Sequence, residues 1–225
     1  MSILFTPIAV GSLTVPNRFV RSATHDYMSD DEGHVRDAGV ELFARLAEGE
    51  VGLIVTGHAN VQPSGKASPR QMGVYDDRFV AGLARITEAV HRFPSKVFLQ
   101  IAHAGRQTKE RDCGTVPVSP SAVYDPVSKV MPRELAAGEV RTLIDDFVSA
   151  ADRARRAGFD GVQLHAAHGY LLSSFLSPHT NRRTDEWGGS VENRARSLLE
   201  ILRGVKTACG RDFPVMVKLN STDFL

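Results

Sequence analysis

The sequence predicts an α/β fold built on a parallel sheet, of the (β/α)8-barrel type but incomplete, with about five strand–helix units. The first observation is that short apolar segments bounded by glycine or proline alternate with longer segments whose apolar residues recur at helical spacing. The second is that polar side chains gather where the apolar segments end, and the strands of a barrel deliver such residues to one face. These residues are Thr24, His58, Gln100, His165, His168 and Lys218. An open doubly wound sheet is the alternative, but it would need a glycine-rich turn after its first strand, and residues 22–28 are SATHDYM.

The first quarter of the chain predicts a hairpin or plug followed by one strand–helix unit. Residues 5–16 are apolar but broken by prolines and a glycine, which suits a short hairpin before the main sheet. Residues 19–24 are the first predicted strand, and residues 38–48 carry the apolar stripe of a helix. The second strand is predicted over residues 53–56 and is expected to open into a loop at residues 57–60.

The middle of the chain predicts two further units and an insert. Asp76 or Asp77 can cap a helix that runs to the proline at position 94, and residues 97–102 form the third predicted strand. Residues 108–137 are too long for a simple connection and are expected to form a lid or rim. A helix follows from about Val140 and is closed by a glycine at position 158.

The last part of the chain predicts the fourth and fifth strands. Residues 161–164 form a short buried strand that delivers its polar residues into a loop, and Ser190 can cap the next helix. Residues 215–219 are expected to form a buried fifth strand, after which the sequence stops. The expected organisation is therefore a single barrel domain over residues 1–225, truncated after its fifth strand.

Composition favours a small-molecule ligand over a polyanionic partner. The 225 residues are 42% hydrophobic and 24% charged, as in an ordinary globular protein, and 27 basic less 26 acidic residues leave a net charge of +1. This balance predicts neither nucleic-acid binding nor attraction to an anionic membrane. Cys113 and Cys209 are isolated, and no apolar run is long enough to span a membrane, so a cytoplasmic protein is expected.

The most chemically suggestive segment is the turn after the fourth predicted strand. His165, His168 and Tyr170 place two imidazoles and a phenol within six positions. They can hydrogen-bond an anionic oxygen and supply a proton. A structural histidine or a metal site is the alternative, but no nearby carboxylate or cysteine completes a convincing metal site, and none is predicted.

Five motifs along the chain resemble those of the old yellow enzyme family. They are, in order, NRFVRSAT, GLIVTG, LQIAHAGR, AGFDGVQLHAAHGYLLSSFLSPHTNRRTDEWGG and NRARSLLEIL. The resemblance covers essentially the whole chain and implies a (β/α)8-barrel oxidoreductase with FMN as cofactor and NADH or NADPH as reductant. It also implies reduction of an activated alkene, an unsaturated carbonyl or nitro compound, by hydride from flavin N5.

The resemblance assigns the flavin contacts as follows. Ala23, Thr24 and His58 would meet the flavin largely through backbone groups, and Gln100 would hydrogen-bond the pyrimidine edge of the ring. Lys218 stands where the family more often has arginine, near flavin N1 and O2, and would act there as a point charge. His25 stands where relatives often have threonine or cysteine beside the flavin. Two alternatives stay open for its side chain: it contacts the flavin ring, or it does not.

The substrate residues follow from the same resemblance. His165 and His168 would hold the carbonyl or nitro oxygen, and Tyr170 would protonate the α-carbon. Tyr27 is a weaker candidate for the pocket wall. Four further motif residues are expected to form a charged, stacked loop that braces the site: Arg182, Arg183, Asp185 and Trp187.

Two alternatives stay open. A dienoyl-CoA reductase or amine dehydrogenase shares the barrel but usually carries a cysteine-rich cluster and a second nucleotide domain. A catalytically silent partial barrel that serves as a binding or assembly module is the other, because the family holds the flavin phosphate with loops after the seventh and eighth strands. Two open sheet edges also predict a homo-oligomer.

Overall fold

The computed structural model describes residues 2–223 and contains one five-stranded parallel sheet. The strands lie in the sheet in the order β3-β4-β5-β8-β9, which is also their order along the chain. A doubly wound sheet would reverse this order at a switch point, whereas a barrel keeps it. The barrel-type prediction is therefore confirmed, with five strands of the barrel present. Their bounds are β3 (Val20–Arg21), β4 (Leu53–Asn60), β5 (Lys96–Ala102), β8 (Gly161–Ala166) and β9 (Val215–Leu219).

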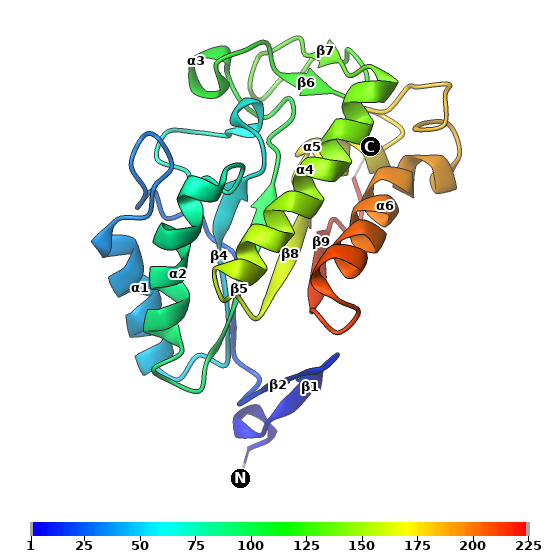
Figure 1. Ribbon diagram of the computed structural model, residues 1–225. Coiled ribbons are helices and arrows are strands. Elements are labelled where there is room, and N and C mark those ends of the chain that lie inside the picture. Colours follow the sequence, from blue (N-terminus) through cyan, green and yellow to red (C-terminus); the bar gives the residue numbers. More distant parts are fainter. Residues whose placement is uncertain (1, 224–225) are drawn as a thin grey trace.

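Four long helices cover one face of this sheet, as Figure 1 shows. They are α1 (Asp37–Glu48), α2 (Val80–Val90), α4 (Ala137–Arg156) and α6 (Val191–Cys209). Ile54, Leu99 and Val162 point to these helices and belong to the main apolar core. Each helix buries an apolar stripe against the strands it connects, which is the usual layering of a parallel α/β fold.

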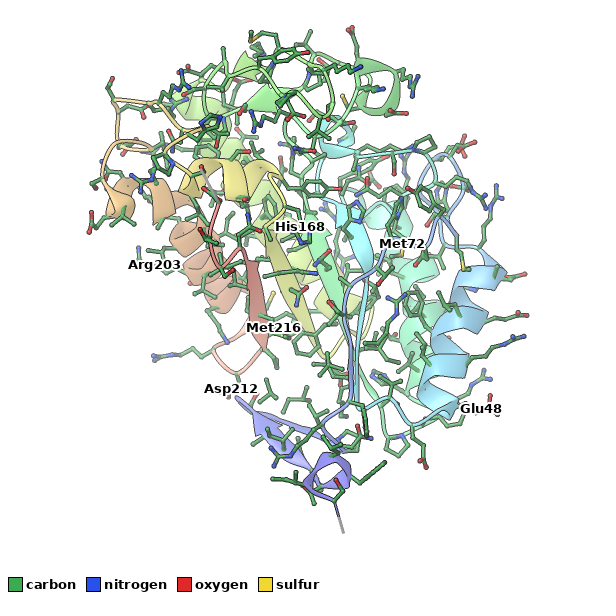
Figure 2. The ribbon with its side chains drawn as sticks, turned by 180° about the vertical axis from the view of Figure 1, so that it is seen from behind. Glu48, Met72, His168, Arg203, Asp212 and Met216 are labelled. Carbon is green, nitrogen blue, oxygen red and sulfur yellow. The ribbon has the colours of Figure 1, made fainter. Side chains whose placement is uncertain are left out.

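The opposite face of the sheet, called here the inner face, is apolar at the amino ends of the strands. Leu53, Val55 and Phe98 form a separate buried cluster there, and Met216 of β9 packs against it. Figure 2 looks onto this face and shows Met216 on its strand and His168 beyond the other end of the sheet. Because side chains alternate along a strand, the next inward positions carry the polar residues of the site.

The predicted N-terminal hairpin is present and lies below the inner face. Strands β1 (Ile8–Val10) and β2 (Leu13–Val15) pair antiparallel, and Figure 1 places them at the amino ends of the main strands. Val15 joins the inner apolar cluster, and the Ser12 hydroxyl donates to the carbonyl of Asp212 at 2.6 Å. The hairpin thus extends the inner apolar cluster, and the two together are called here the apolar floor. The hairpin also links the start of the chain to the segment before β9.

Helix α6 begins and packs as its sequence predicts. The Ser190 hydroxyl accepts a hydrogen bond from the backbone N–H of Asn193, which satisfies one of the free donors of the first turn. Gly204 lets α6 approach α4 closely, because a Cβ there would lie 2.5 Å from a methyl of Val148. This contact joins the helices that precede and follow β8 in the chain.

Three strands differ from the predictions by more than one residue at their carboxyl ends. Strand β3 is limited to Val20–Arg21 rather than residues 19–24, because the chain turns away from β4 after two paired residues. Strand β4 continues to Asn60 rather than ending at 56, and β8 continues to Ala166, so His58 and His165 belong to strands and not to loops. Strand β9 has the predicted bounds, but the expectation that it is buried is wrong, since its residues are partly exposed and Leu219 is 55% exposed. One neighbouring strand, β8, pairs with it among the residues described.

The insert forms a small layer of its own at the carboxyl end of the sheet (Figure 1). It contains α3 (Glu110–Cys113) and the short parallel pair β6 (Val118–Ser119) and β7 (Arg133–Glu134).

A further helix that the sequence pattern did not predict, α5 (Leu171–Leu176), follows the loop after β8. The remaining short elements are the 3-10 turns η1 (Ile3–Phe5), η2 (Pro63–Gly65) and η3 (Asp77–Phe79). Asp76 caps η3, and α2 continues from it. Within residues 2–223, no helix combines the length and apolarity needed to cross a membrane.

Candidate active site

Six aromatic side chains meet at the carboxyl ends of three strands. Neighbouring rings of this group, called here the ring cluster, have centroids 3.8–6.3 Å apart. Two lie in the loop after β3, one in β4, one in β8 and two in the loop after β8. They are His25, Tyr27, His58, His165, His168 and Tyr170. The structure therefore brings together residues up to 145 positions apart that the sequence placed separately at strand ends.

Tyr170 contacts the two central rings of the ring cluster, His58 and His165. Its hydroxyl is 3.2 Å from Nε2 of His58, and its ring packs on His165 with centroids 4.6 Å apart and planes 37° apart. His168 meets His165 edge to face at 5.0 Å. The hydroxyl and both histidines predicted to hold a substrate oxygen are thus neighbours, with Tyr170 half-buried and His168 exposed.

Burial keeps the imidazoles neutral near pH 7. It lowers the pKa of His58 to about 3, with the nearby His25, His165 and His168 adding to the effect. It lowers the pKa of His165 to about 3 as well, assisted by His168 and Lys218. The pKa values of His25 and His168 are lowered for the same primary reason. Each ring therefore carries one N–H and one lone pair, so it can donate a hydrogen bond without bringing a positive charge.

The tautomer of His165 follows from its backbone contact. The backbone N–H of Ala167 donates to Nδ1 of His165 at 3.4 Å, which requires a lone pair on that nitrogen. The hydrogen of the neutral ring is then on Nε2. His165 can therefore present an N–H donor to an oxygen in the site, as the predicted oxyanion role needs.

Tyr170 holds its proton firmly at neutral pH. Burial, with a smaller contribution from Tyr27, raises the pKa of Tyr170 to about 12. The protonated phenol can act as a general acid toward a strongly basic carbon, and it is a poor acid toward water. This state agrees with the predicted role and makes any group that stabilises the phenolate important.

The backbone of two ring-cluster residues is unusual. Tyr27 and His168 have φ of 57° and 60°, the left-handed region that side chains with a Cβ rarely occupy. At His168 this turn is supported by its N–H, which donates to the Asn220 side chain at 3.0 Å. The turn reverses the chain after β8 so that Tyr170 comes back over His165.

An amide pair lies on the inner face below the ring cluster. Nε2 of Gln100 donates to Oε1 of Gln163 at 2.7 Å, and both side chains are buried. Gln100 was predicted as a flavin ligand, whereas Gln163 was missed. The available signal was the alternation of β8, which puts Gln163 on the same face as His165, two residues away.

The other predicted flavin residues lie around this amide pair. Ala23 packs against the apolar floor, and Gly57 approaches the Thr24 carbonyl so closely that a Cβ would lie 2.9 Å from it. The ring of His25 shares a 2.8 Å hydrogen bond with the Ser68 hydroxyl, a partner that the sequence did not indicate. Lys218 reaches across the inner face, with Nζ 3.4 Å from the Ser22 hydroxyl. This contact joins the ends of the first and fifth strands of the sheet, which shows how strongly the sheet curves.

The donors on this face suit a planar heteroaromatic ring with one polar edge. Buried amides of Gln100 and Gln163 have donor and acceptor capacity beyond their mutual bond, and Lys218, opposite His165 in the sheet, supplies a cation on the same face. The apolar floor includes Met216. An isoalloxazine ring fits this combination of an apolar bed, amide donors and acceptors, and one positive charge. By contrast, within the described residues no group of three or more His, Cys, Asp and Glu side chains is arranged to hold a metal ion.

The loop after α5 braces the site from outside, in the way the sequence predicts. Arg183 is buried and forms an ion pair with Asp185 at 2.5 Å, and it also donates to the carbonyls of Pro120 and Leu135 in the insert. Trp187 is fully buried, and the guanidinium stacked on it belongs to Arg141 of α4, at 5.4 Å from the ring centroid. The loop therefore links the insert and α4 to the turn that carries Tyr170.

The fold and this set of side chains define a class of protein, the flavin-binding barrel oxidoreductases. The sequence model of the NADH:flavin oxidoreductase / NADH oxidase family matches residues 3–225, and the chain belongs to that family. The chain is 41% identical over 224 residues to an NADH oxidase of Thermoanaerobacter brockii, covering 99% of this chain and 34% of the relative. It is 39% identical to an NADPH dehydrogenase of Bacillus subtilis, covering 98% of this chain and 64% of the relative. The chain thus spans less than two thirds of these relatives.

Solved structures agree with the fold. A 2-naphthoyl-CoA reductase in complex with 2-naphthoyl-CoA superposes with a TM-score of 0.95 at 34% identity, covering 99% of this chain and 36% of that one. An old yellow enzyme homologue from Zymomonas mobilis superposes with a TM-score of 0.92 at 33% identity, covering 97% of this chain and 63% of that one. The predicted resemblance to the old yellow enzymes is confirmed by these comparisons.

Proposed function

We propose that the protein works with FMN as an NAD(P)H-dependent reductase of alkenes conjugated to a carbonyl or nitro group. The observation that carries this proposal is the placement of a protonated phenol beside two neutral imidazoles at the carboxyl ends of the strands. Family membership supports the flavin and the nicotinamide reductant. The cofactor supplies the hydride chemistry, and the residues of this chain supply binding, orientation and the proton.

Two histidines are proposed to hold the substrate oxygen. Hydride addition to the β-carbon of an enone moves negative charge onto the carbonyl oxygen. Nε2–H of His165 can donate to that oxygen, and His168 lies 5.0 Å away, ring to ring, to provide a second donor. Both donors are neutral and fixed before the charge develops, so they stabilise the enolate more than the ground-state carbonyl.

Tyr170 is proposed to deliver the proton. Its O–H bond breaks, the hydrogen forms a bond to the α-carbon, and the bonding electrons remain on the phenolate oxygen, which later recovers a proton from water. Gln100, Gln163 and Lys218 are proposed to hold the polar edge of the flavin ring, with Ala23 and Thr24 beneath it. His25 is proposed to border the same ring from the loop after β3.

The Tyr170→Phe variant tests this assignment by separating the two half-reactions in rapid-mixing experiments with the FMN-loaded chain. Loss of a general acid should slow oxidation of the reduced protein by an enone about 10²- to 10⁴-fold, while reduction by NAD(P)H stays close to the native rate. Tyr75→Phe is the matched control, because that phenol bonds Arg78 away from the ring cluster. Equal slowing of both half-reactions would show that Tyr170 has a packing role.

A thioester substrate is the second candidate, and one observation favours it. The 2-naphthoyl-CoA reductase structure has a TM-score of 0.95 over 99% of this chain. An α,β-unsaturated or aromatic acyl-CoA presents the same carbonyl chemistry as an enone. Comparing turnover of a free enone with that of the matching CoA thioester, under the same conditions, decides between the two substrate classes.

A further inference from the structure

His58 reaches the ring cluster only because β4 contains a bulge. The strand pairs with β5 in regular register up to Val55 opposite Phe98, and then shifts by one residue so that His58 stands opposite Gln100. Val55, Phe98 and Gln100 all belong to the inner face. Without the extra residue, Gly57 would stand opposite Gln100 and the imidazole of His58 would point to the helices. The bulge therefore aims this side chain at the site.

Among residues 2–223, the ring of His58 hydrogen-bonds one other side chain, that of Tyr170. The Nε2 to hydroxyl distance is 3.2 Å, and the imidazole is only 8% exposed. His25 packs on its other side, edge to face at 4.7 Å. The backbone of His58 is held as well, since its carbonyl accepts from Gln71. A buried, fixed imidazole thus holds the hydroxyl that the proposed function uses as the acid.

We propose that His58 is a positioning residue whose Nε2–H donates to the Tyr170 hydroxyl oxygen, turns the phenol hydrogen toward the substrate and stabilises the phenolate left after proton transfer. This inference rests on the proposed role of Tyr170.

The proposed acid role of Tyr170 requires this hydrogen bond to run from His58 to the phenol oxygen. If the phenol donated to His58, its hydrogen would be committed to the imidazole and would not be available to a carbon atom. If His58 donates, the oxygen accepts and its own hydrogen is free. The neutral ring has one N–H to give, and a bond from it to a phenolate is charge-assisted and stronger than one to a phenol. In the transfer step the hydrogen of Tyr170 goes to carbon, and His58 keeps its own.

The groups around the Tyr170 phenol increase the importance of the N–H donor of His58. The groups that face the phenol are His165 with His168 from β8 and its loop, Tyr27 from the loop after β3, and His58 from β4. Burial raises the pKa of Tyr170 to about 12, which opposes loss of the proton. A hydrogen bond that strengthens as the phenolate forms acts against that barrier.

The His58→Phe and His58→Gln pair tests the proposal. Phenylalanine keeps a planar ring against His25 and removes the donor, whereas glutamine keeps an N–H donor at a similar distance from the backbone. Oxidation of the reduced protein by an enone should slow about ten- to hundredfold in His58→Phe and recover most of that loss in His58→Gln. The His58→Phe, Tyr170→Phe double variant should be no slower than Tyr170→Phe alone.

A second readout needs no flavin. Ultraviolet difference titration of the chain against its Tyr170→Phe variant reports the pKa of this one phenol. The pKa should rise in His58→Phe and return toward the native value in His58→Gln. Nitrogen NMR of the native chain near pH 7 should show the Nε2–H tautomer of His58, a measurement that depends on no variant.

The outcomes separate the two proposals. If Tyr170→Phe slows substrate reduction but His58→Phe changes neither that rate nor the phenol pKa, the role of His58 is overturned and the proposed function stands. An Nδ1–H tautomer of His58 overturns it as well. If Tyr170→Phe leaves substrate reduction at the native rate, the proposed acid is wrong, whatever the His58 variants do.

Discussion

Protonation of the buried His103 should make this protein sensitive to mild acid. The imidazole is 1% exposed; its Nδ1 accepts from the backbone N–H of Gly105 at 3.0 Å, and Nε2 lies 3.1 Å from Oε1 of Gln62. Gln62 donates in turn to Asp146. A second proton on the ring would place an N–H at Nδ1, facing the backbone N–H of Gly105 that donates to this nitrogen in the neutral ring. Burial accordingly lowers the pKa of His103 from 6.5 to about 3.

The sign and size of the effect follow from this shift. Between about pH 6.5 and pH 3 the unfolded chain binds a proton that the folded chain refuses, so the free energy of unfolding falls as the pH falls. The contribution is complete above pH 6.5 and declines by about 1.4 kcal/mol per pH unit, or about 2 kcal/mol at pH 5. The pKa values of His58 and His165 are lowered to about 3 too, so the three together give a slope of about 4 kcal/mol per pH unit.

Urea unfolding at fixed ionic strength, at several pH values between about 7 and 4.5, measures this slope. His103→Gln should lower stability at neutral pH by about 1 kcal/mol but flatten the slope by about 1.4 kcal/mol per pH unit. Ser64→Ala is the matched control, because its hydroxyl lies 3.5 Å from the same imidazole and carries no titrating group. It should lower stability equally at each pH. An unchanged slope in His103→Gln would refute the reasoning.

Two further changes test packing around the site. Gly161→Ala should destabilise the chain by about 3 kcal/mol in denaturant unfolding, since the new Cβ would lie 2.5 Å from the Phe98 ring and 2.6 Å from the Pro214 carbonyl; Phe98→Leu should recover part of this loss. Arg183→Lys should cost about 3 kcal/mol, because a single ammonium cannot replace the fork that bonds Asp185 and two insert carbonyls; a loss below about 0.5 kcal/mol would show that the loop does not depend on it.

Much of the fold could be predicted because local pattern and global fold agree. Residues 215–219 are a short, mostly apolar run with the boundaries of β9 as the structure has it, and Ser190 caps α6 as its type and position indicate. The strand-end histidines could be grouped before the structure was known, because parallel strands of a barrel point their carboxyl ends the same way.

The rest depends on features that leave little trace in the sequence. The β4 bulge involves one residue of register against β5, so no pattern within residues 53–60 could show that the ring of His58 faces Tyr170. Gln163 was missed although the alternation of β8 puts it on the same face as His165, and only the structure shows its hydrogen bond to Gln100. The exposure of β9 likewise depends on which strands lie beside it, and its apolar residues could not reveal that.

Tyr27 and His168 have φ angles in the left-handed region, and this backbone strain at the site lowers the stability of the fold. A residue with a Cβ loses about 1 kcal/mol in that conformation relative to glycine, and both positions carry ring side chains instead. The strain lies in the backbone and is present before any ligand arrives, so binding does not have to form these turns. Glycine at either position would relax the backbone and remove a wall of the site. Selection for heat resistance and selection for turnover should therefore pull these two positions in opposite directions.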